Sequence, residues 1–76
     1  MNNFRRNLLM KALQALDTAE TYAQRALEEE QGCFDNIPES FDGTERYDKM
    51  ENAIDNLECA LDSISDAKTQ IEDASV

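Results

Sequence analysis

Carboxylates are the side chains of this sequence with the most regular spacing. Five of them stand three or four residues apart in a stretch without Gly or Pro, namely Asp48, Glu51, Asp55, Glu58 and Asp62. Closely spaced carboxylates can act as a general acid and base, ligate a metal ion, or present negative charge to a partner. On a helix, these spacings place all five along one flank.

The other residues argue against catalysis and metal binding. The chain has no His, which excludes Ser-His and Cys-His nucleophiles and the Glu-x-x-His ligands of di-iron bundles. Its two Cys cannot supply the four ligands of a structural zinc site. The acidic residues Asp35, Glu39, Asp42 and Glu45 do not follow the spacing of a calcium-binding loop. We therefore expect no enzyme activity, no catalytic residue, no metal site and no cofactor.

The length and net charge of the chain limit its number of domains and the partners that it can bind. A chain of 76 residues forms one domain with a small core. The net charge of −10 argues against direct binding to nucleic acid or to an anionic membrane. No apolar run approaches the roughly 20 residues that span a bilayer, and the start of the chain leads into no signal-peptide core. We expect a cytoplasmic protein, because reducing conditions suit unpaired thiols at Cys33 and Cys59.

Every Gly and the single Pro fall between residues 31 and 43. We predict a single domain over 1–76, with a helix over 3–30, a connection over 31–43 and a helix over 44–74. Basic residues near the start of the first helix and acidic residues near the end of the second favour an antiparallel arrangement. In that arrangement Arg5 and Arg6 lie beside Glu72 and Asp73.

The connection carries the signals for the helix ends. Gly32 is placed where a left-handed residue commonly follows a helix. Asp42 has the spacing of an N-cap in a capping box, and Thr44 is a rival cap. A short helical turn near Pro38 would let three apolar side chains close the end of the core: Phe34, Ile37 and Phe41.

The second helix carries a heptad repeat. Its a and d positions are Tyr47, Met50, Ile54, Leu57, Leu61, Ile64, Lys68 and Ile71. This seam is apolar except at Lys68, which can extend to solvent or set the register. Position g is always Ala between residues 53 and 74, and such small residues let a neighbouring helix approach closely. The carboxylate stripe lies on the opposite flank.

The first helix is apolar over a wider arc than one partner helix needs. Its apolar residues are Phe4, Leu8, Leu9, Ala12, Leu13, Ala15, Leu16, Ala19, Tyr22, Ala23, Ala26 and Leu27. A single seam requires about two positions in seven. The surplus can be open to solvent, covered by a second copy, or covered by another protein.

Self-association accounts best for this surplus. We predict an all-α, antiparallel two-helix hairpin that resembles a coiled coil and pairs into a homodimeric four-helix bundle. The expected core and self-association residues are Leu9, Leu13 and Leu16 with the apolar seam of the second helix.

Three segments of the chain resemble a known group of proteins. Residues 26–31 read A-L-E-E-E-Q, residues 34–40 read F-D-N-I-P-E-S, and residues 45–58 read E-R-Y-D-K-M-E-N-A-I-D-N-L-E. They resemble small, functionally uncharacterised acidic helical proteins of Gram-positive bacteria, their phages and mobile elements. The resemblance carries over no catalytic or binding residue. It implies a phage or mobile-element accessory protein, and such proteins often block a host protein.

Two functions are consistent with these features. In the first, the acidic stripe of Asp48, Glu51, Asp55, Glu58 and Asp62 binds and blocks a basic host protein, such as a nucleic-acid-handling or defence protein, by imitating a phosphate backbone. The alternative is a structural, self-associating helical module whose acidic face only confers solubility.

Overall fold

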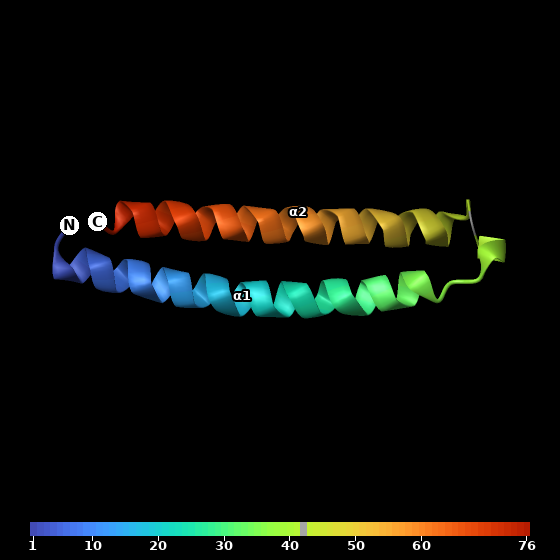
Figure 1. The fold of residues 1–76 in the computed structure, drawn as a ribbon, viewed down its shortest axis with the longest axis horizontal. Helices are drawn as coiled ribbons and strands as arrows, with labels where there is room; N and C mark the ends of the chain where they lie inside the picture. The colour runs from blue at the N-terminus through green and yellow to red at the C-terminus, as the bar shows by residue number, and fades with distance from the viewer. Residues whose placement is uncertain (42) are drawn as a thin grey trace.

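Two long helices form an antiparallel hairpin in the computed structural model (Figure 1). Helix α1 spans Asn3–Asp35, the 3-10 helix η1 spans Glu39–Phe41, and helix α2 spans Glu45–Ala74. The structure describes residues 1–41 and 43–76, and describes residue 41 by its backbone alone. The prediction of an all-α two-helix hairpin is confirmed.

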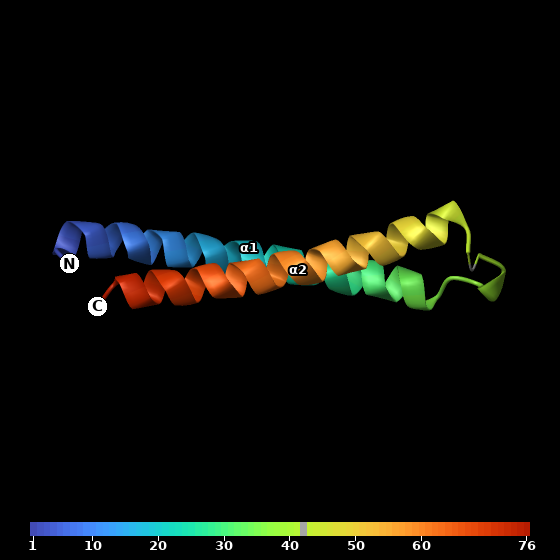
Figure 2. The same cartoon turned by 90° about the horizontal axis from the view of Figure 1, so that it is seen from above.

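The hairpin is a narrow rod. Its principal extents are 59 × 15 × 13 Å, and both termini lie at the end opposite the connection (Figures 1 and 2). The helices cross at a shallow angle near their middle, as the view in Figure 2 shows. Among the described residues only Ile54 is buried, with 7% of its surface exposed. The core is therefore a single line of contact between two helices.

Helix α1 ends later than the sequence predicts. We expected it to stop at residue 30 with Gly32 just beyond, but it continues through Gly32 to Asp35. Its last turn carries Phe34, whose ring packs on Tyr47 of α2 with centroids 5.0 Å apart. Glycine inside a helix costs about 1 kcal/mol relative to alanine, and this tertiary contact offsets the cost. The Asn36 side chain then donates a hydrogen bond of 2.9 Å to the carbonyl of Gly32.

Helix α2 begins at the rival cap. Thr44 is the N-cap, and its hydroxyl accepts a hydrogen bond of 3.2 Å from the backbone N–H of Tyr47. The left-handed residue of the connection is Gly43, with a φ of 77°, and not Gly32. The proposed cap Asp42 lies outside the described residues.

The connection contains the expected short helical turn, η1, directly after Pro38. Of the apolar side chains expected to close this end, Phe34 packs on Tyr47 and Ile37 is half-buried. The side chain of Phe41 lies outside the described part of the chain.

Both helices contribute a heptad seam. All eight predicted a and d residues of α2 are buried or half-buried. In α1 the seam follows alternating steps of four and three residues, through Leu9, Leu13, Leu16, Glu20, Ala23, Leu27, Glu30 and Phe34. These spacings are those of a left-handed coiled coil, and they assign a to residues 13, 20, 27 and 34 of α1.

Candidate interaction surfaces

The seam divides the hairpin into two faces. Because the helices run in opposite directions, position g of α1 lies beside position g of α2, and position e lies beside position e. Positions g and c of both helices therefore form one face, and positions e and b form the other. We call these the neutral face and the acidic face.

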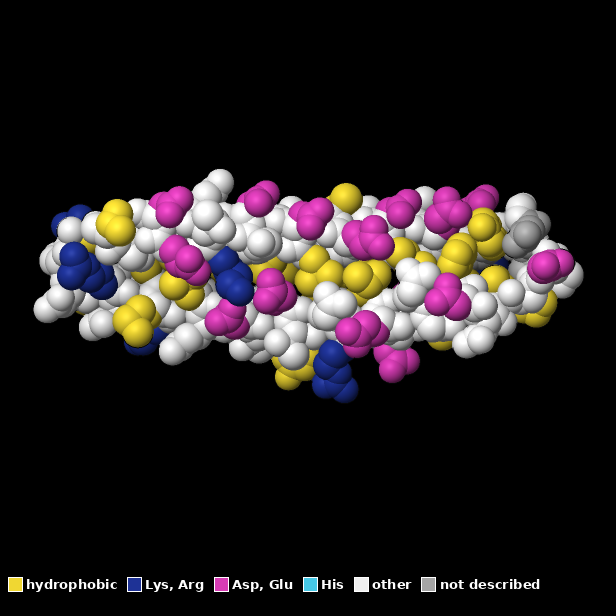
Figure 3. Space-filling view, in the orientation of Figure 1, with side chains coloured by type: hydrophobic (Ala, Val, Ile, Leu, Met, Phe, Trp, Pro, Cys, Tyr) yellow, Lys and Arg dark blue, Asp and Glu magenta, His cyan; other side chains and the backbone are white. Residues whose placement is uncertain are grey.

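The acidic face collects carboxylates from both helices. Neither helix places Lys or Arg at its b or e positions. The predicted stripe lies here, and all five of its side chains are exposed. Figure 3 shows carboxylates gathered along α2 on the side that faces the reader. The acidic side chains of this face are Asp17, Glu28, Asp35, Asp48, Glu51, Asp55, Glu58, Asp62 and Glu72.

The neutral face has almost no charge along its middle. On α1 it runs from Leu8 to Ala26, and on α2 from Ala53 to Ala74, with no Asp, Glu, Lys or Arg at c or g between these limits. Two large apolar residues on it are open to solvent, Leu8 with 49% and Tyr22 with 66% of their surface exposed. The members of this face are Leu8, Ala12, Ala15, Ala19, Tyr22, Ala26, Ala53, Asn56, Ala60, Ser63, Ala67, Gln70 and Ala74.

This arrangement sorts the residues that the sequence analysis grouped as core and self-association residues. Leu9, Leu13 and Leu16 lie with the apolar a and d residues of α2 along the seam within one chain. The surplus apolar residues of α1 instead form a second column at c and g. Position g of α2, the alanine column, lies on the same side of the hairpin as this second column.

Lys68 is a charged residue of the seam that forms ion pairs with the facing helix. Its Nζ lies 2.6 Å from Asp17 Oδ1 and 3.4 Å from Glu20 Oε1 on the facing helix. The hydrogen bond to Asp17 raises the pKa of Lys68 above its ordinary value of 10.5, although partial burial acts in the opposite direction. The Lys68 side chain is 24% exposed. Lys68 therefore links the two helices at a site that is partly shielded from water.

The carboxylate partners of Lys68 were missed in the sequence. We expected Lys68 to be the only charged seam residue, but Glu20 and Glu30 also occupy seam positions of α1 and are half-buried. The alternating steps of four and three residues from Leu9 to Phe34 could have predicted these seam positions. They were not recognised because the apolar arc of α1 is wide enough to contain more than one possible seam.

The expected pairing at the open end of the hairpin does not form. Among the described residues, no ion pair joins Arg5 or Arg6 to Glu72 or Asp73. The antiparallel direction nevertheless places both termini at this end (Figure 1). The antiparallel orientation is therefore present without ion pairs between these helix ends.

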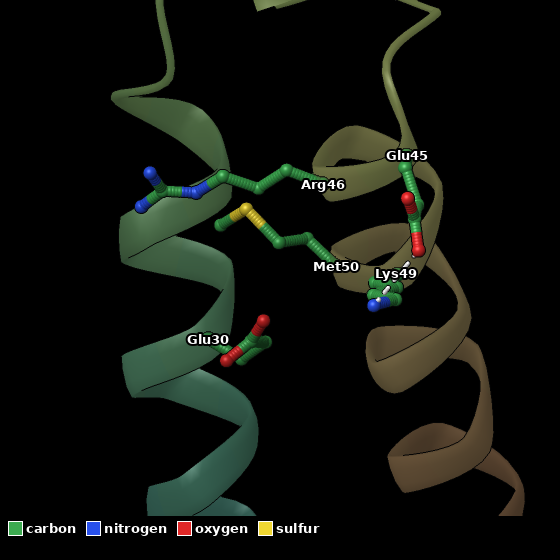
Figure 4. A pocket seen from close by; sticks show the side chains of 5 residues that line it. All are labelled: Glu30, Glu45, Arg46, Lys49 and Met50. Atoms are coloured by element: carbon green, nitrogen blue, oxygen red, sulfur yellow. Dashed lines mark ion pairs between the residues drawn. The ribbon is translucent and has the colours of Figure 1, made fainter.

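A shallow hollow of about 380 Å³ lies between the last turns of α1 and the first turns of α2. Figure 4 shows its lining residues, Glu30, Glu45, Arg46, Lys49 and Met50. Lys49 and Glu45 form an exposed ion pair of 3.0 Å on α2, and the side chains of Arg46 and Met50 extend toward α1. The hollow offers charged groups at an open surface, which suits contact with a protein better than enclosure of a substrate.

The remaining reactive groups are separate from one another. Cys33 and Cys59 are free and exposed. Within residues 1–41 and 43–76, no three His, Cys, Asp or Glu side chains are grouped so that they could ligate a metal ion. Neither described helix is long and apolar enough to cross a membrane.

Comparison with other proteins adds no relative. No protein-family model matches the chain, and no curated protein or solved structure is significantly similar to it. The case for a function therefore depends on the two faces.

Proposed function

We propose that this protein is a non-enzymatic interaction module whose acidic face binds a basic surface of another protein. The observation that carries the proposal is the segregation of charge. Carboxylates of both helices share one face whose b and e positions hold no Lys or Arg, and Lys68 of the seam reaches this face at Asp17. The c and g positions of the opposite face are uncharged along its middle. A net charge of −10 needs no such sorting to keep a protein soluble.

The shape of the acidic face favours a partner that handles nucleic acid. Neighbouring carboxylates of the stripe stand about 5–6 Å apart on a straight helix, and the rod is 59 Å long. A rigid line of negative charge can occupy a groove that otherwise binds a phosphate backbone. The same charge disfavours direct binding of nucleic acid by the module itself.

The resemblance to small acidic proteins of phages and mobile elements supplies a context for this role. We propose that the module blocks a nucleic-acid-handling or defence protein of a bacterial host. We place it in the cytoplasm, whose reducing conditions suit two exposed thiols.

A structural, self-associating module is the second candidate. Ile54 is the only buried residue within the described part of the chain, so the hairpin has little core of its own. Chains of this size usually need oligomerisation or a covalent constraint for stability. Under this alternative the acidic face contributes solubility and nothing else.

Selective neutralisation separates the two functions. The variant Asp55→Asn/Glu58→Gln/Asp62→Asn removes charge from the acidic face. The matched control Glu39→Gln/Asp66→Asn/Asp73→Asn removes as many carboxylates outside it. Each protein is immobilised and exposed to host lysate, with and without competing duplex DNA, and captured proteins are identified by mass spectrometry.

The interaction proposal expects a basic protein that wild type and the control capture and the acidic-face variant does not. Competing DNA should displace this protein, and salt should weaken its capture because exposed charges are screened over about 8–10 Å. Equal capture by the acidic-face variant, or capture that DNA does not affect, would exclude the phosphate-mimic role.

A further inference from the structure

The neutral face is an interaction surface without a partner in the hairpin. It exposes Leu8 and Tyr22, and a helix that is apolar on two flanks is typical of a bundle with more than two helices. We propose that a second copy of this chain covers the neutral face, with α1 antiparallel to the partner's α1. This inference goes beyond the acidic-face proposal and does not depend on it.

Charge determines where a second copy can dock. Two chains that each carry −10 repel each other through most of their surfaces. They can meet closely only where each is neutral, and the stretches from Leu8 to Ala26 and from Ala53 to Ala74 are neutral at every c and g position. Contact through this face leaves both acidic faces directed outward.

A stable dimer requires a substantial part of the hairpin surface. An interface of ordinary size buries about 800 Å² on each partner, which is about one-seventh of the 5663 Å² of accessible surface of the hairpin. The neutral face has thirteen members among the 76 residues, eight of them Ala, and it extends along the middle of both helices.

One antiparallel register makes the α1 columns complementary to themselves. When Arg5 lies opposite the partner's Glu29, each large side chain meets a small one and the charged ends meet opposite charges. Every contact occurs twice, as an isologous interface requires. The pairs are Arg5 with the partner's Glu29, Leu8 with the partner's Ala26, Ala12 with the partner's Tyr22, and Ala15 with the partner's Ala19.

Helix α2 is compatible with the same two-fold axis. Its small and neutral residues pair in the same way when Ser63 lies opposite the partner's Ala67, and the midpoint of this pairing is Ser65. The midpoint of the α1 pairing is Asp17. Counting back along both helices from the contact of Phe34 with Tyr47 brings Asp17 level with Ile64, one residue from Ser65. A single axis therefore serves both helices.

The first test compares matched charges on the two faces. Ala15→Glu places a carboxylate near the proposed axis on each copy, and Gln14→Glu places the same group on the acidic face. Analytical ultracentrifugation should show a wild-type dimer, an Ala15→Glu dissociation constant raised at least about 1,000-fold, and a nearly unchanged Gln14→Glu dimer. A wild type that is monomeric at micromolar concentration, or an Ala15→Glu variant as dimeric as wild type, overturns the proposal.

Charge exchange tests the register without disturbing the apolar contacts. Arg5→Glu and Glu29→Arg should each weaken the dimer by about 3- to 30-fold, because each change affects two symmetric ion pairs. The double variant Arg5→Glu/Glu29→Arg should recover wild-type affinity. Additive weakening in the double variant excludes this register.

Disulfide crosslinking tests the same interface without the Ala15→Glu variant, which could fail to fold. In a Cys33→Ser/Cys59→Ser background, a chain with Ala15→Cys is mixed with a chain with Ala19→Cys and oxidised. The mixture should form disulfide-linked dimers in higher yield than either chain alone. A mixture of Gln14→Cys and Thr18→Cys has the same spacing on other columns and should not crosslink. Equal yields in the two mixtures overturn the proposed face.

Discussion

The two faces of the hairpin differ although the same two helices build them. The b and e positions of the acidic face hold nine carboxylates and no Lys or Arg, whereas the neutral face is lined with Ala, Leu, Tyr and small polar residues. Nine of the 17 acidic residues belong to the acidic face, and none lies on the middle of the neutral face. The absence of charge leaves the neutral face able to pack closely against another helix layer.

The seam between the faces should be the most sensitive part of the molecule. Ile54→Ala removes part of the only side chain buried in the described structure, and we expect a loss of about 2–5 kcal/mol in the free energy of unfolding. Urea denaturation followed by circular dichroism measures it. Met10→Ala is the control, since Met10 is 57% exposed on the acidic face and should change stability by no more than about 0.5 kcal/mol. Equal effects would mean that the seam is not the core.

The neutral face should make thermal stability depend on concentration. A dimer gains about 2.7 kcal/mol from a hundredfold rise in concentration, which raises Tm by about 5–10 °C. Differential scanning calorimetry at two concentrations measures this shift. Ala15→Glu should remove it and Gln14→Glu should preserve it. A wild-type Tm that does not depend on concentration would mean that the neutral face contributes no dimer contact to stability.

The acidic face should act on stability in the opposite direction. Asp55→Asn/Glu58→Gln/Asp62→Asn removes four like-charge pairs at helix spacings, the fourth being Asp62 with Asp66, so we expect the free energy of unfolding to rise by about 0.8–2 kcal/mol. The gain should shrink in high salt, because screening weakens the same repulsion in wild type. A loss of stability at low salt would show that these carboxylates have stabilising partners in the hairpin.

Lys68 gives the smallest expected effect, and it is confined to alkaline pH. Its pKa is raised in the folded protein by the hydrogen bond to Asp17. Its stabilising contribution is therefore complete below the unfolded pKa of about 10.4 and is lost as pH rises through the higher folded value. The difference in stability between wild type and Lys68→Met should be constant near neutral pH and shrink above about pH 10.5. Lys49→Met, at an exposed ion pair within α2, is the control for the loss of a lysine outside the seam.

The sequence by itself determined the two helices, the heptad seam of α2 and the spacing of the acidic stripe. These properties depend on residue type and on the 3.6-residue period of the helix, which act over a few residues. Pro38 and Gly43 also marked the connection, because they act on their own backbone, whereas Gly32 lies within α1.

Only the tertiary structure decided where α1 ends and which of its apolar columns packs inside the hairpin. Phe34, beyond Gly32 in α1, packs on Tyr47, and Lys68 pairs across the seam with Asp17 and Glu20. These contacts join residues far apart in the chain, so local helix propensity cannot predict them. The division into two faces arises for the same reason: the alanine column of α2 joins the surplus column of α1 only when the helices run antiparallel in this register.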